Sequence, residues 1–550
     1  MPRAMQVQPK LGAAAALGRM GIVVALLSLG CAGRSGSEAE PQPQPREQTS
    51  AHASPLDAEL ERRWAERGIE PSPLASDAEF LRRASLDLIG RVPTRAEVEA
   101  FLADASSDKR SKTIDALLSS DEFAAHWAGI WVDALLPSDA RVRRIAGESL
   151  ERYFSAALLE NRAWDRVVDE LLASEGSLDD AAQLGYLAGR AARGVPREEL
   201  VADLSSTTAR VFLGAKIECA QCHDHPYDPS FSREDFWAQA AFFGRTKVAF
   251  DRSGEGPPAA EVRERPRGEL RVALDDREDA PKQLIAPRFM GAANEADAED
   301  RRAQLAALIV EDPRFAEATV GHVWTRLLGR GIVEPWDDLL DASERPALLT
   351  LLAAEFRASG HDLRALIRSV VLSQAYQRSS IGPQTEPTKI AAAEAAFARA
   401  AVRPLSAEQL FASLITVTGL EQVEGRAFRK AVRQRREAAL LEYQFVFSDD
   451  EMGSADAFSG NVPQALLLLN GAITNQGVVA REGGSLAQIL SASEATDARL
   501  EALWLTVYGR RPSADELALA REAVGDGERA RDWEDLMFAM LYSSEFASNH

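Results

Sequence analysis

Helix-start signals recur along this 550-residue chain and constrain its fold more than any other feature. Each signal places a Ser or Thr three residues before a Glu, so that the two side chains satisfy free backbone donors at a helix start. Apolar side chains also repeat at helical spacing and form a stripe for burial, as in residues 363–371. We therefore expect a mainly α-helical fold. The signals are Ser76 with Glu79, Thr94 with Glu97, and Ser513 with Glu516.

Residues 248–296 interrupt the helical pattern. They contain Gly and Pro, and they include an alternating apolar and polar stretch at residues 270–274. We expect a loop-rich insertion with a short β-hairpin here. The insertion would separate two helical domains, residues 56–247 and residues 297–546.

The N-terminus resembles a bacterial lipoprotein signal peptide over residues 1–30. Basic residues precede a short apolar run, Met20 to Leu29, which is too short to span a bilayer, and Gly30 stands before Cys31. The resemblance implies cleavage before Cys31 and lipidation of its sulfur. An ordinary secretory peptide and an uncleaved anchor are the alternatives.

Residues 31–55 form a disordered tether in this interpretation, because Gly, Ser, Glu, Gln and Pro dominate them and cannot build a core. Nothing later in the sequence is long and apolar enough to cross a membrane. We therefore expect an exported protein of the cell envelope or periplasm that contacts the membrane through a lipid anchor only.

The charge of the chain limits its partners. The formal net charge is −21, and the expected signal peptide carries only basic charges, so the mature chain would be more acidic still. Such acidity argues against nucleic acid and anionic membrane surfaces as partners. It suits a soluble body or docking to a basic partner.

Cys219, Cys222 and His223 have the C-x-x-C-H spacing of c-type haem attachment. Two thiols on one helical turn can face the two vinyl edges of a porphyrin, and the next residue can offer its imidazole to the iron. His223 would be the proximal ligand, with its other ring nitrogen held by a carbonyl or carboxylate. Export favours this interpretation, because haem is attached to thiols outside the cytoplasm.

Two other interpretations of the same residues stay open. An oxidising compartment favours a structural disulfide between Cys219 and Cys222. A metal such as zinc could instead take Cys219, Cys222, His225 and a distant fourth ligand. The cofactor is therefore haem c in the first interpretation, and zinc or none in the alternatives.

A sixth iron ligand would decide between electron transfer and catalysis, because an open position admits a small molecule. Whether the protein is an enzyme stays open for this reason. The candidates, each also interpretable as structural, are His126, Met290, His322 and His361. Four aromatic residues after the Cys-His block can either line a haem or pack in the core: Phe236, Trp237, Phe242 and Phe243.

The sequence also contains a faint internal repeat. Residues 90–94 and 509–513 share the order Gly-Arg-x-Pro before a capped helix, and a Ser-Ser turn follows later in each copy. We expect a duplicated helical hairpin with a structural purpose. A binding role for Arg91 and Arg510 is the alternative.

Several motifs, in order, resemble two uncharacterised domain families that usually occur together in large exported proteins. Those proteins often begin with a planctomycete-type cytochrome c domain, which we do not expect here because residues 32–54 are too short. The chain also has Gly321-His322 where the family tends to show Asn-Arg. The motifs are residues 80–83, 86–94, 219–228 and 242–244 for the first family, and 312–315, 323–324, 329–335, 373–380 and 463–466 for the second.

The resemblance implies architecture more than activity. We expect a lipid-anchored haem c protein in electron transfer or haem-dependent oxidation, with a redox partner protein. The alternative is a non-redox binding or scaffold protein of the envelope, whose cysteine pair is a disulfide or a metal site. The sequence contains no P-loop, no G-x-S-x-G elbow and no H-E-x-x-H signature.

Overall fold

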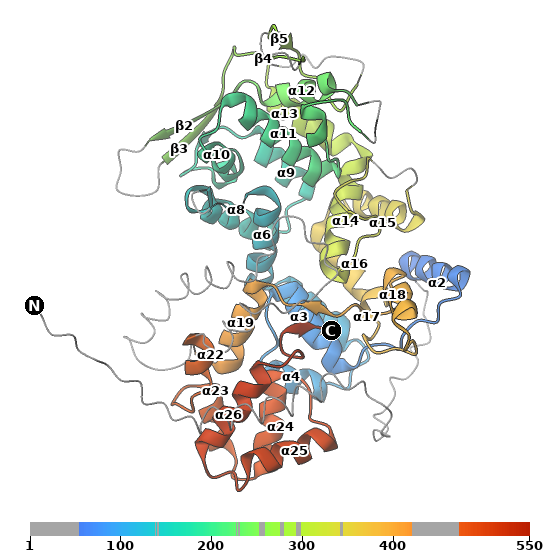
Figure 1. Cartoon of the computed structure of the whole chain (residues 1–550), viewed down its shortest axis with the longest axis vertical. Coiled ribbons are helices and arrows are strands. Elements are labelled where there is room, and N and C mark those ends of the chain that lie inside the picture. The colour runs from blue at the N-terminus through green and yellow to red at the C-terminus, as the bar shows by residue number, and fades with distance from the viewer. Residues whose placement is uncertain are drawn as a thin grey trace, which may run out of the picture. The chain divides into compact units, whose positions relative to one another are not determined.

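The computed structural model describes residues 54–550 except for 138, 140–141, 227, 229–230, 252–258, 276–279, 293–298, 341–344 and 421–471 (Figure 1). Over these residues, 22 α-helices dominate and the strands are short and antiparallel, so the fold is mainly α as predicted. None of the helices described is long and apolar enough to span a bilayer. The expected signal peptide, Cys31, nearly all of the tether and the motif at 463–466 lie outside the described residues.

The chain forms two compact units that are interleaved in sequence. Among the described residues, the central unit comprises 54–74 and 111–400, and the C-terminal unit comprises 75–110 and 401–550. These units differ from the consecutive domains expected from the sequence, and residues 248–296 lie inside the central unit. Periodicity shows that a helix has a face to bury, but it does not show which distant helix covers that face.

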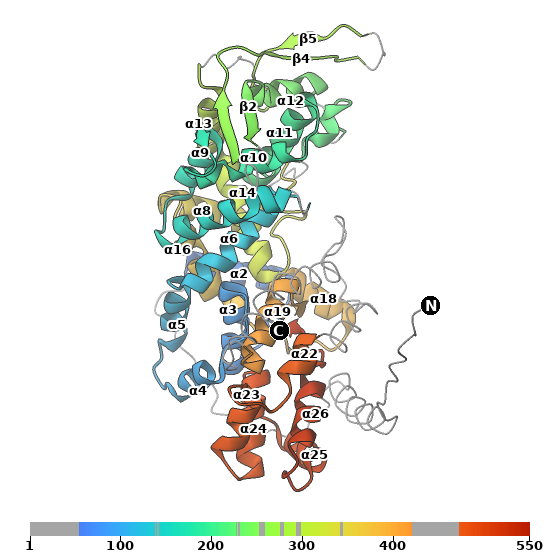
Figure 2. The same cartoon turned by 90° about the vertical axis from the view of Figure 1, so that its left-hand side faces the viewer.

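Seven of the 14 α-helices described in the central unit begin at a capping side chain. The helices pack in pairs, with α6 on α8, α11 on α14 and α9 on α13 (Figures 1 and 2). Their order places the loop after α11 next to α12. The α-helices are α2 (Pro55–Arg67), α5 (Lys109–Leu118, which starts at the unit boundary), α6 (Asp121–Leu135), α8 (Glu148–Leu159), α9 (Trp164–Ala173), α10 (Gly185–Ala192), α11 (Arg197–Leu213), α12 (Arg233–Ala240), α13 (Arg301–Glu311), α14 (Pro313–Leu328), α15 (Ala347–Ala358), α16 (Leu363–Leu372), α17 (Gln374–Gln377) and α18 (Pro387–Ala395).

Short helical turns and strands complete this unit. The turns are η1 (Arg143–Gly147), η2 (Ala182–Leu184), η3 (Glu218–Gln221) and η4 (Ala241–Phe243). The strands β1 (Gly176–Ser177), β3 (Ala259–Glu264) and β2 (Thr246–Asp251) form one antiparallel sheet in that order. The hairpin predicted near residue 270 forms from β4 (Leu270–Val272) and β5 (Gln283–Ile285).

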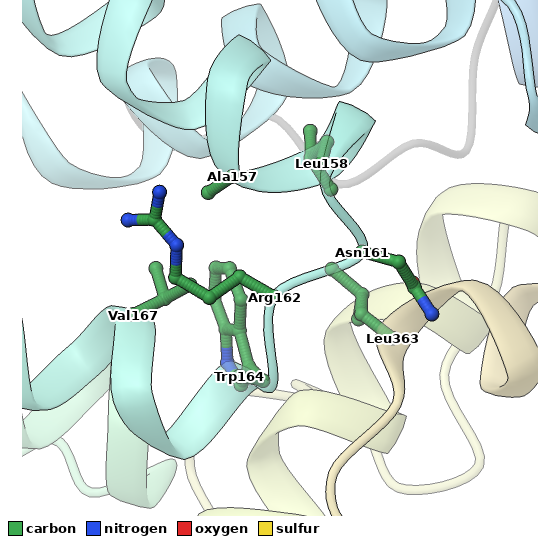
Figure 3. A pocket seen from close by; sticks show the side chains of 7 residues that line it. All are labelled: Ala157, Leu158, Asn161, Arg162, Trp164, Val167 and Leu363. Carbon is green, nitrogen blue, oxygen red and sulfur yellow. The ribbon is translucent and has the colours of Figure 1, made fainter.

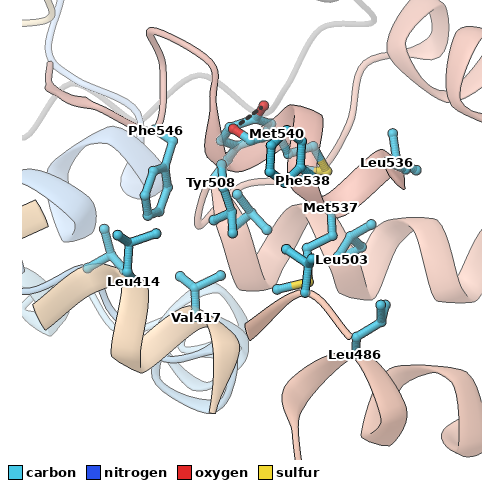
Figure 4. Packing of buried hydrophobic residues seen from close by; sticks show 14 of the residues in the cluster. Leu414, Val417, Leu486, Leu503, Tyr508, Leu536, Met537, Phe538, Met540 and Phe546 are labelled. Carbon is cyan, nitrogen blue, oxygen red and sulfur yellow. Dashed lines mark hydrogen bonds between the residues drawn. The ribbon is translucent and has the colours of Figure 1, made fainter. Parts of the chain in front are cut away.

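The C-terminal unit packs its helices around one apolar cluster, part of which Figure 4 shows. Leu86 and Val92, from the early segment of the chain, belong to this cluster together with Leu410 and Trp504 from the late segment. Their shared burial explains why α3 folds with the end of the chain. The elements are α3 (Asp77–Ile89), α4 (Arg95–Ala103), β6 (Arg403–Pro404), α19 (Ala407–Thr418), α22 (Ala472–Gly477), α23 (Ser485–Ala492), α24 (Thr496–Val507), α25 (Ala514–Val524), α26 (Ala530–Leu541) and β7 (Ser548–Asn549).

The two Gly-Arg-x-Pro turns, residues 90–94 and 509–513, have closely matching backbones. Gly90 has φ 72° and Gly509 has φ 71°, the left-handed conformation that glycine adopts without strain. A capping box follows each turn, at the starts of α4 and α25. A Cβ built on Gly509 would lie 3.7 Å from Pro93 Cγ, so the second turn packs directly against the first copy.

Both repeat arginines are engaged by carboxylates. Arg91 donates to both carboxylate oxygens of Glu97, at 2.9 and 3.1 Å. Arg510 donates in the same way to Glu516, at 2.9 and 2.7 Å, and also to Glu545, at 2.6 and 2.8 Å. The arginines therefore tie each turn to the capping glutamate of the next helix, which is a structural role.

Candidate functional site

The Cys-His loop, residues 214–225, follows α11 and contains the short helix η3. Cys219 and Cys222 are free thiols, and both are exposed to solvent. Ala220, between them, is fully buried and donates its N–H to the carbonyl of Ile217. The buried alanine turns the intervening backbone inward, so the two thiols face outward from one helical turn.

The ring orientation of His223 is set by a neighbouring carbonyl. His223 is exposed, and its Nδ1 lies 2.7 Å from the backbone oxygen of Asp224. A carbonyl can only accept a hydrogen bond, so Nδ1 carries the proton and Nε2 carries the lone pair. His223 therefore presents to solvent the nitrogen that an iron or another metal would bind.

His225 differs from His223 because both of its ring nitrogens are used inside the protein. Its Nε2 lies 2.9 Å from the carbonyl oxygen of Lys216, and its Nδ1 accepts the N–H of Asp228 at 3.0 Å. The backbone N–H of His225 donates to the carbonyl of Phe231 at 2.9 Å. His225 is 4% exposed and closes the loop on itself.

Helix α12 holds the other side of the loop. The indole N–H of Trp237 donates to the carbonyl of Gln221 at 3.2 Å, and the backbone N–H of Arg233 donates to Asp224 at 3.0 Å. A capping box of Ser232 and Asp235 starts this helix. The loop is therefore fixed at its buried positions, while the sulfurs and the ring of His223 stay outside.

Residues far along the chain hold the start of the loop. Gly214 ends α11 with φ 55°, and its carbonyl accepts the N–H of Leu339 at 2.6 Å. A Cβ on Gly214 would come within 2.8 Å of the Leu339 side chain, so only glycine fits here. Lys216 and Arg210 both reach the carboxylate of Asp337, at 3.0 and 3.4 Å.

These contacts bear on the two alternatives to haem. In the structure Cys219 and Cys222 are separate thiols rather than a disulfide. His225 could bind a metal only after one of its two ring nitrogens lost its hydrogen bond. Among the described residues, no group of three or more His, Cys, Asp and Glu side chains is arranged to hold a metal ion.

The four aromatic residues that could line a haem belong to the core instead. Their exposed fractions range from 0% to 7%, and they lie on α12 and η4 beneath the Cys-His loop. Trp237 holds the loop through its indole N–H, and all four residues present little surface to a bound ring. These residues are Phe236, Trp237, Phe242 and Phe243.

Two of the proposed sixth ligands are histidines that burial keeps neutral. Burial, together with Arg326, lowers the pKa of His126 on α6 to about 3. Burial also lowers the pKa of His322 on α14 to about 3. The ring of His322 lies between Trp131 and Trp336, with centroid distances of 4.5 and 4.4 Å. His322 therefore has the environment of a packing residue.

The other two candidates lie in left-handed backbone conformations. His361, at φ 58°, packs its ring against Phe315 and Phe356, which again indicates a packing role. Met290, at φ 44°, donates its N–H to the side chain of Gln239 on α12, at 2.9 Å. Of the four candidates, Met290 is thus on a segment that packs against the helix holding the Cys-His loop.

A small depression lies elsewhere in the central unit, at the turn between α8 and α9 (Figure 3). Arg162 and Trp164 line it from the turn, and Leu363 from α16. The polar groups of this turn are engaged within the protein, for example Arg162 with Glu170 at 2.7 Å. We assign no role to it.

Sequence reasoning missed Asp337 and Leu339 as parts of the site. They lie beyond the insertion, and nothing in the spacing of the Cys-His block points to them. Only Gly214 gives a signal, because a glycine directly after a long helix predicts a left-handed C-cap into which another segment can pack.

The donors present fit haem c, the group that the C-x-x-C-H spacing implies. Cys219 and Cys222 are exposed on one turn, and the next residue, His223, is exposed as well, with its Nδ1 bound to a carbonyl so that its Nε2 carries the lone pair. The second ring nitrogen of His223 is held by a backbone carbonyl, as haem and other metal-binding histidines are commonly held.

Comparisons with known proteins agree with the motifs. The family described as "PSCyt2: Protein of unknown function (DUF1549)" matches residues 55–248, and "PSD1: Protein of unknown function (DUF1553)" matches residues 301–524. The chain therefore belongs to the proteins that carry these two uncharacterised domains together, as the resemblance predicted. Neither the curated proteins nor the solved structures include a significant match to it.

Proposed function

We propose that this protein carries haem c on Cys219 and Cys222, with His223 as the axial ligand of the iron. The proposal is supported mainly by one observation: three donors of the right kind are exposed together, while the rest of their loop is tied down. When bound, haem would supply a one-electron redox centre. The chain's own residues fix the ligand tautomer at His223 and hold both thiols on one turn.

Attachment can be tested with mature protein made in a host that has haem-maturation machinery. We expect a covalent tetrapyrrole on the peptide containing residues 219–223, detected by mass spectrometry. The double variant Cys219→Ser, Cys222→Ser should lose it completely. Gln221→Ala is the matched control, because it changes a neighbour whose side chain is not a proposed donor. Absence of a tetrapyrrole from wild-type protein would end the proposal.

The role of His223 is tested separately from attachment. The variant His223→Ala should keep the covalent mass, because both thiols remain. It should change the visible spectrum and the midpoint potential, because the iron loses its axial nitrogen. A spectrum identical to that of the wild type would show that another residue binds the iron.

Met290 offers a way to separate electron transfer from haem-dependent oxidation. If its sulfur fills the sixth position, Met290→Leu should open the iron to small ligands such as carbon monoxide. Met537→Leu, a core methionine of the C-terminal unit, controls for the substitution itself. An iron that already binds carbon monoxide in the wild type favours oxidation chemistry instead.

Export and lipid anchoring are part of the same proposal and rest on the sequence of residues 1–31 alone. Cys31 should incorporate a radiolabelled fatty acid in a bacterial host, and Cys31→Ala should not. The acidity of the chain, with a net charge of −21, suits a basic redox partner. Association with such a partner should weaken as ionic strength rises.

A non-redox binding or scaffold role is the second candidate. It is favoured by the burial of the four aromatic residues near the loop, which leaves little apolar surface to shelter a haem. In that case mature protein would be colourless. Its cysteines would be oxidised to a disulfide or would bind zinc together with residues from elsewhere.

A further inference from the structure

The second family region contributes to the Cys-His loop, which belongs to the first. Residues Trp336 to Leu339 lie within the segment matched by PSD1, and the loop lies within the segment matched by PSCyt2. Leu339 donates its N–H to Gly214, and Asp337 binds Lys216. Both contacts lie within the central unit.

Asp337 is well placed to control the loop because it acts at two points. Its Oδ1 is 3.0 Å from the ammonium of Lys216, in the loop, and its Oδ2 is 3.4 Å from Arg210, on α11. The Asp337 side chain is 13% exposed, so this charge is largely removed from solvent. It therefore links the end of α11 to the beginning of the loop.

The link continues from Lys216 toward the donors. The carbonyl of Lys216 is the acceptor for His225, which in turn holds the backbone of Phe231 and Asp228. His223 lies two residues before His225. A shift of Lys216 would therefore displace His225 and its hydrogen bonds, and with them the position of the His223 ring.

Asp337 is itself held in place by its neighbour. The ring of Trp336 stacks on His322 with an interplanar angle of 10°, and His322 meets Trp131 edge-on. Parallel and edge-on contacts of this kind fix ring positions beyond their contribution to burial. The carboxylate is thus presented to Lys216 from a rigid support.

We propose that Asp337 is a positioning residue for the Cys-His loop, so that the haem site is completed only by the second family region. The inference rests on the proposed haem attachment for its redox consequence. Removing the carboxylate would loosen the loop and leave two cations without their shared partner. Excess positive charge near the iron disfavours its oxidised state, so the midpoint potential should rise.

The test compares Asp337→Asn with Asp337→Glu and with the control Glu317→Gln. Glu317 pairs with Arg345 at 2.9 Å in the same unit, and its side chain is also 13% exposed. In haem-free protein, Asp337→Asn should raise the hydrogen-exchange rate of the amides in residues 214–225 about three- to tenfold. Glu317→Gln should leave these amides unchanged, and Asp337→Glu should restore most of their protection.

In haem-loaded protein, the midpoint potential should rise in Asp337→Asn and stay near the wild-type value in Asp337→Glu and Glu317→Gln. An unchanged potential in loaded Asp337→Asn, or equal exchange in Asp337→Asn and Glu317→Gln, would overturn the positioning role. If Asp337→Asn does not fold, Lys216→Gln replaces it in the exchange comparison, because it breaks the contact with the loop and leaves that between Arg210 and Asp337 in place. It should also raise the exchange rate of residues 214–225, and an unchanged rate would overturn the positioning role. A wild-type chain without haem would remove the proposed function, while the exchange comparison would still decide the role of Asp337.

Discussion

The Cys-His loop and the paired Gly-Arg-x-Pro turns are both tightly held, yet they use their reactive groups in opposite ways. In the turns, the guanidinium groups of Arg91 and Arg510 form ion pairs with carboxylates of the same unit. In the loop, internal bonds engage His225, while Cys219 and Cys222 remain exposed. A rigid backbone therefore indicates a functional site only where reactive side chains stay exposed and are not engaged by other residues.

The largest expected effect concerns the second turn. Arg510→Ala should lower the free energy of unfolding by about 2–4 kcal/mol, because the largely buried carboxylates of Glu516 and Glu545 would lose the guanidinium that balances their charge. Chemical denaturation of the C-terminal unit would measure this loss. A loss of unfolding free energy below about 0.5 kcal/mol would show that the ion pairs of Arg510 do not stabilise this turn.

The next effect separates the two histidines of the loop. His225→Ala should cost about 1–3 kcal/mol, because the carbonyl of Lys216 and the N–H of Asp228 lose a buried partner. His223→Ala is the matched control and should cost less than about 0.5 kcal/mol in haem-free protein, because its ring is exposed. Equal losses of unfolding free energy in denaturant titrations would contradict the distinction between His225 as a structural residue and His223 as an exposed donor.

The response to acid should differ between buried histidines and the turn. The pKa of His126 and of His322 is lowered to about 3, against about 6.5 when unfolded. Only the unfolded chain gains these protons at first, so stability is lost as the pH falls from about 6.5 toward 3. The expected loss is at most about 1.4 kcal/mol per pH unit for each histidine.

Glu516 responds in a lower range of pH. Burial raises its pKa, but the hydrogen bond and charge of Arg510 outweigh burial and lower the pKa to about 2, from 4.5. Its contribution is therefore lost only as the pH falls from about 4.5 toward 2.

The histidine effect is tested with the variant His322→Phe. This variant should flatten the dependence of stability on pH between 6.5 and 4, and an unchanged dependence would contradict the lowered pKa of His322. His550, in the C-terminal unit, has a pKa lowered to about 3 by burial and acts with the same sign as His322.

The smallest effect compares the two copies of the turn. Arg91 pairs with Glu97, whose side chain is 44% exposed, whereas Glu516 and Glu545 beside Arg510 are 19% and 28% exposed. Arg91→Ala should therefore cost about 0.5–1 kcal/mol, well below the loss for Arg510→Ala. Melting curves of the two variants under one buffer condition would show the order, and the reverse order would mean that burial of the carboxylate partners does not set the stability of these turns.

Sequence patterns predicted local features better than long-range ones. The capping pairs at Ser76, Thr94 and Ser513 each start a helix, because capping depends on side chains only three residues apart. The early helix α3 instead packs with the end of the chain, and no local pattern carries that information. The grouping of helices into units could not be predicted for this reason.

The same limit applies to the candidate site. The spacing of Cys219, Cys222 and His223 indicated three donors on one surface, since all lie within one turn. The spacing did not show that His225 has a structural role, because that role depends on the carbonyl of Lys216 and on the fold of the backbone around it. The contribution of Asp337 needed the structure, because its partners lie in a different part of the sequence.

The contact between Arg210 and Asp337 joins residues 127 positions apart in the chain. Contacts with such separation form slowly, because the entropy of closing a long loop opposes them until other packing is in place. The start of the Cys-His loop can therefore reach its final shape only after the later segment has been synthesised and has docked. A group attached to these thiols before that point would be attached to a loop that is still unfolded. Docking of the segment that carries Asp337 would then fold the loop next to the attached group.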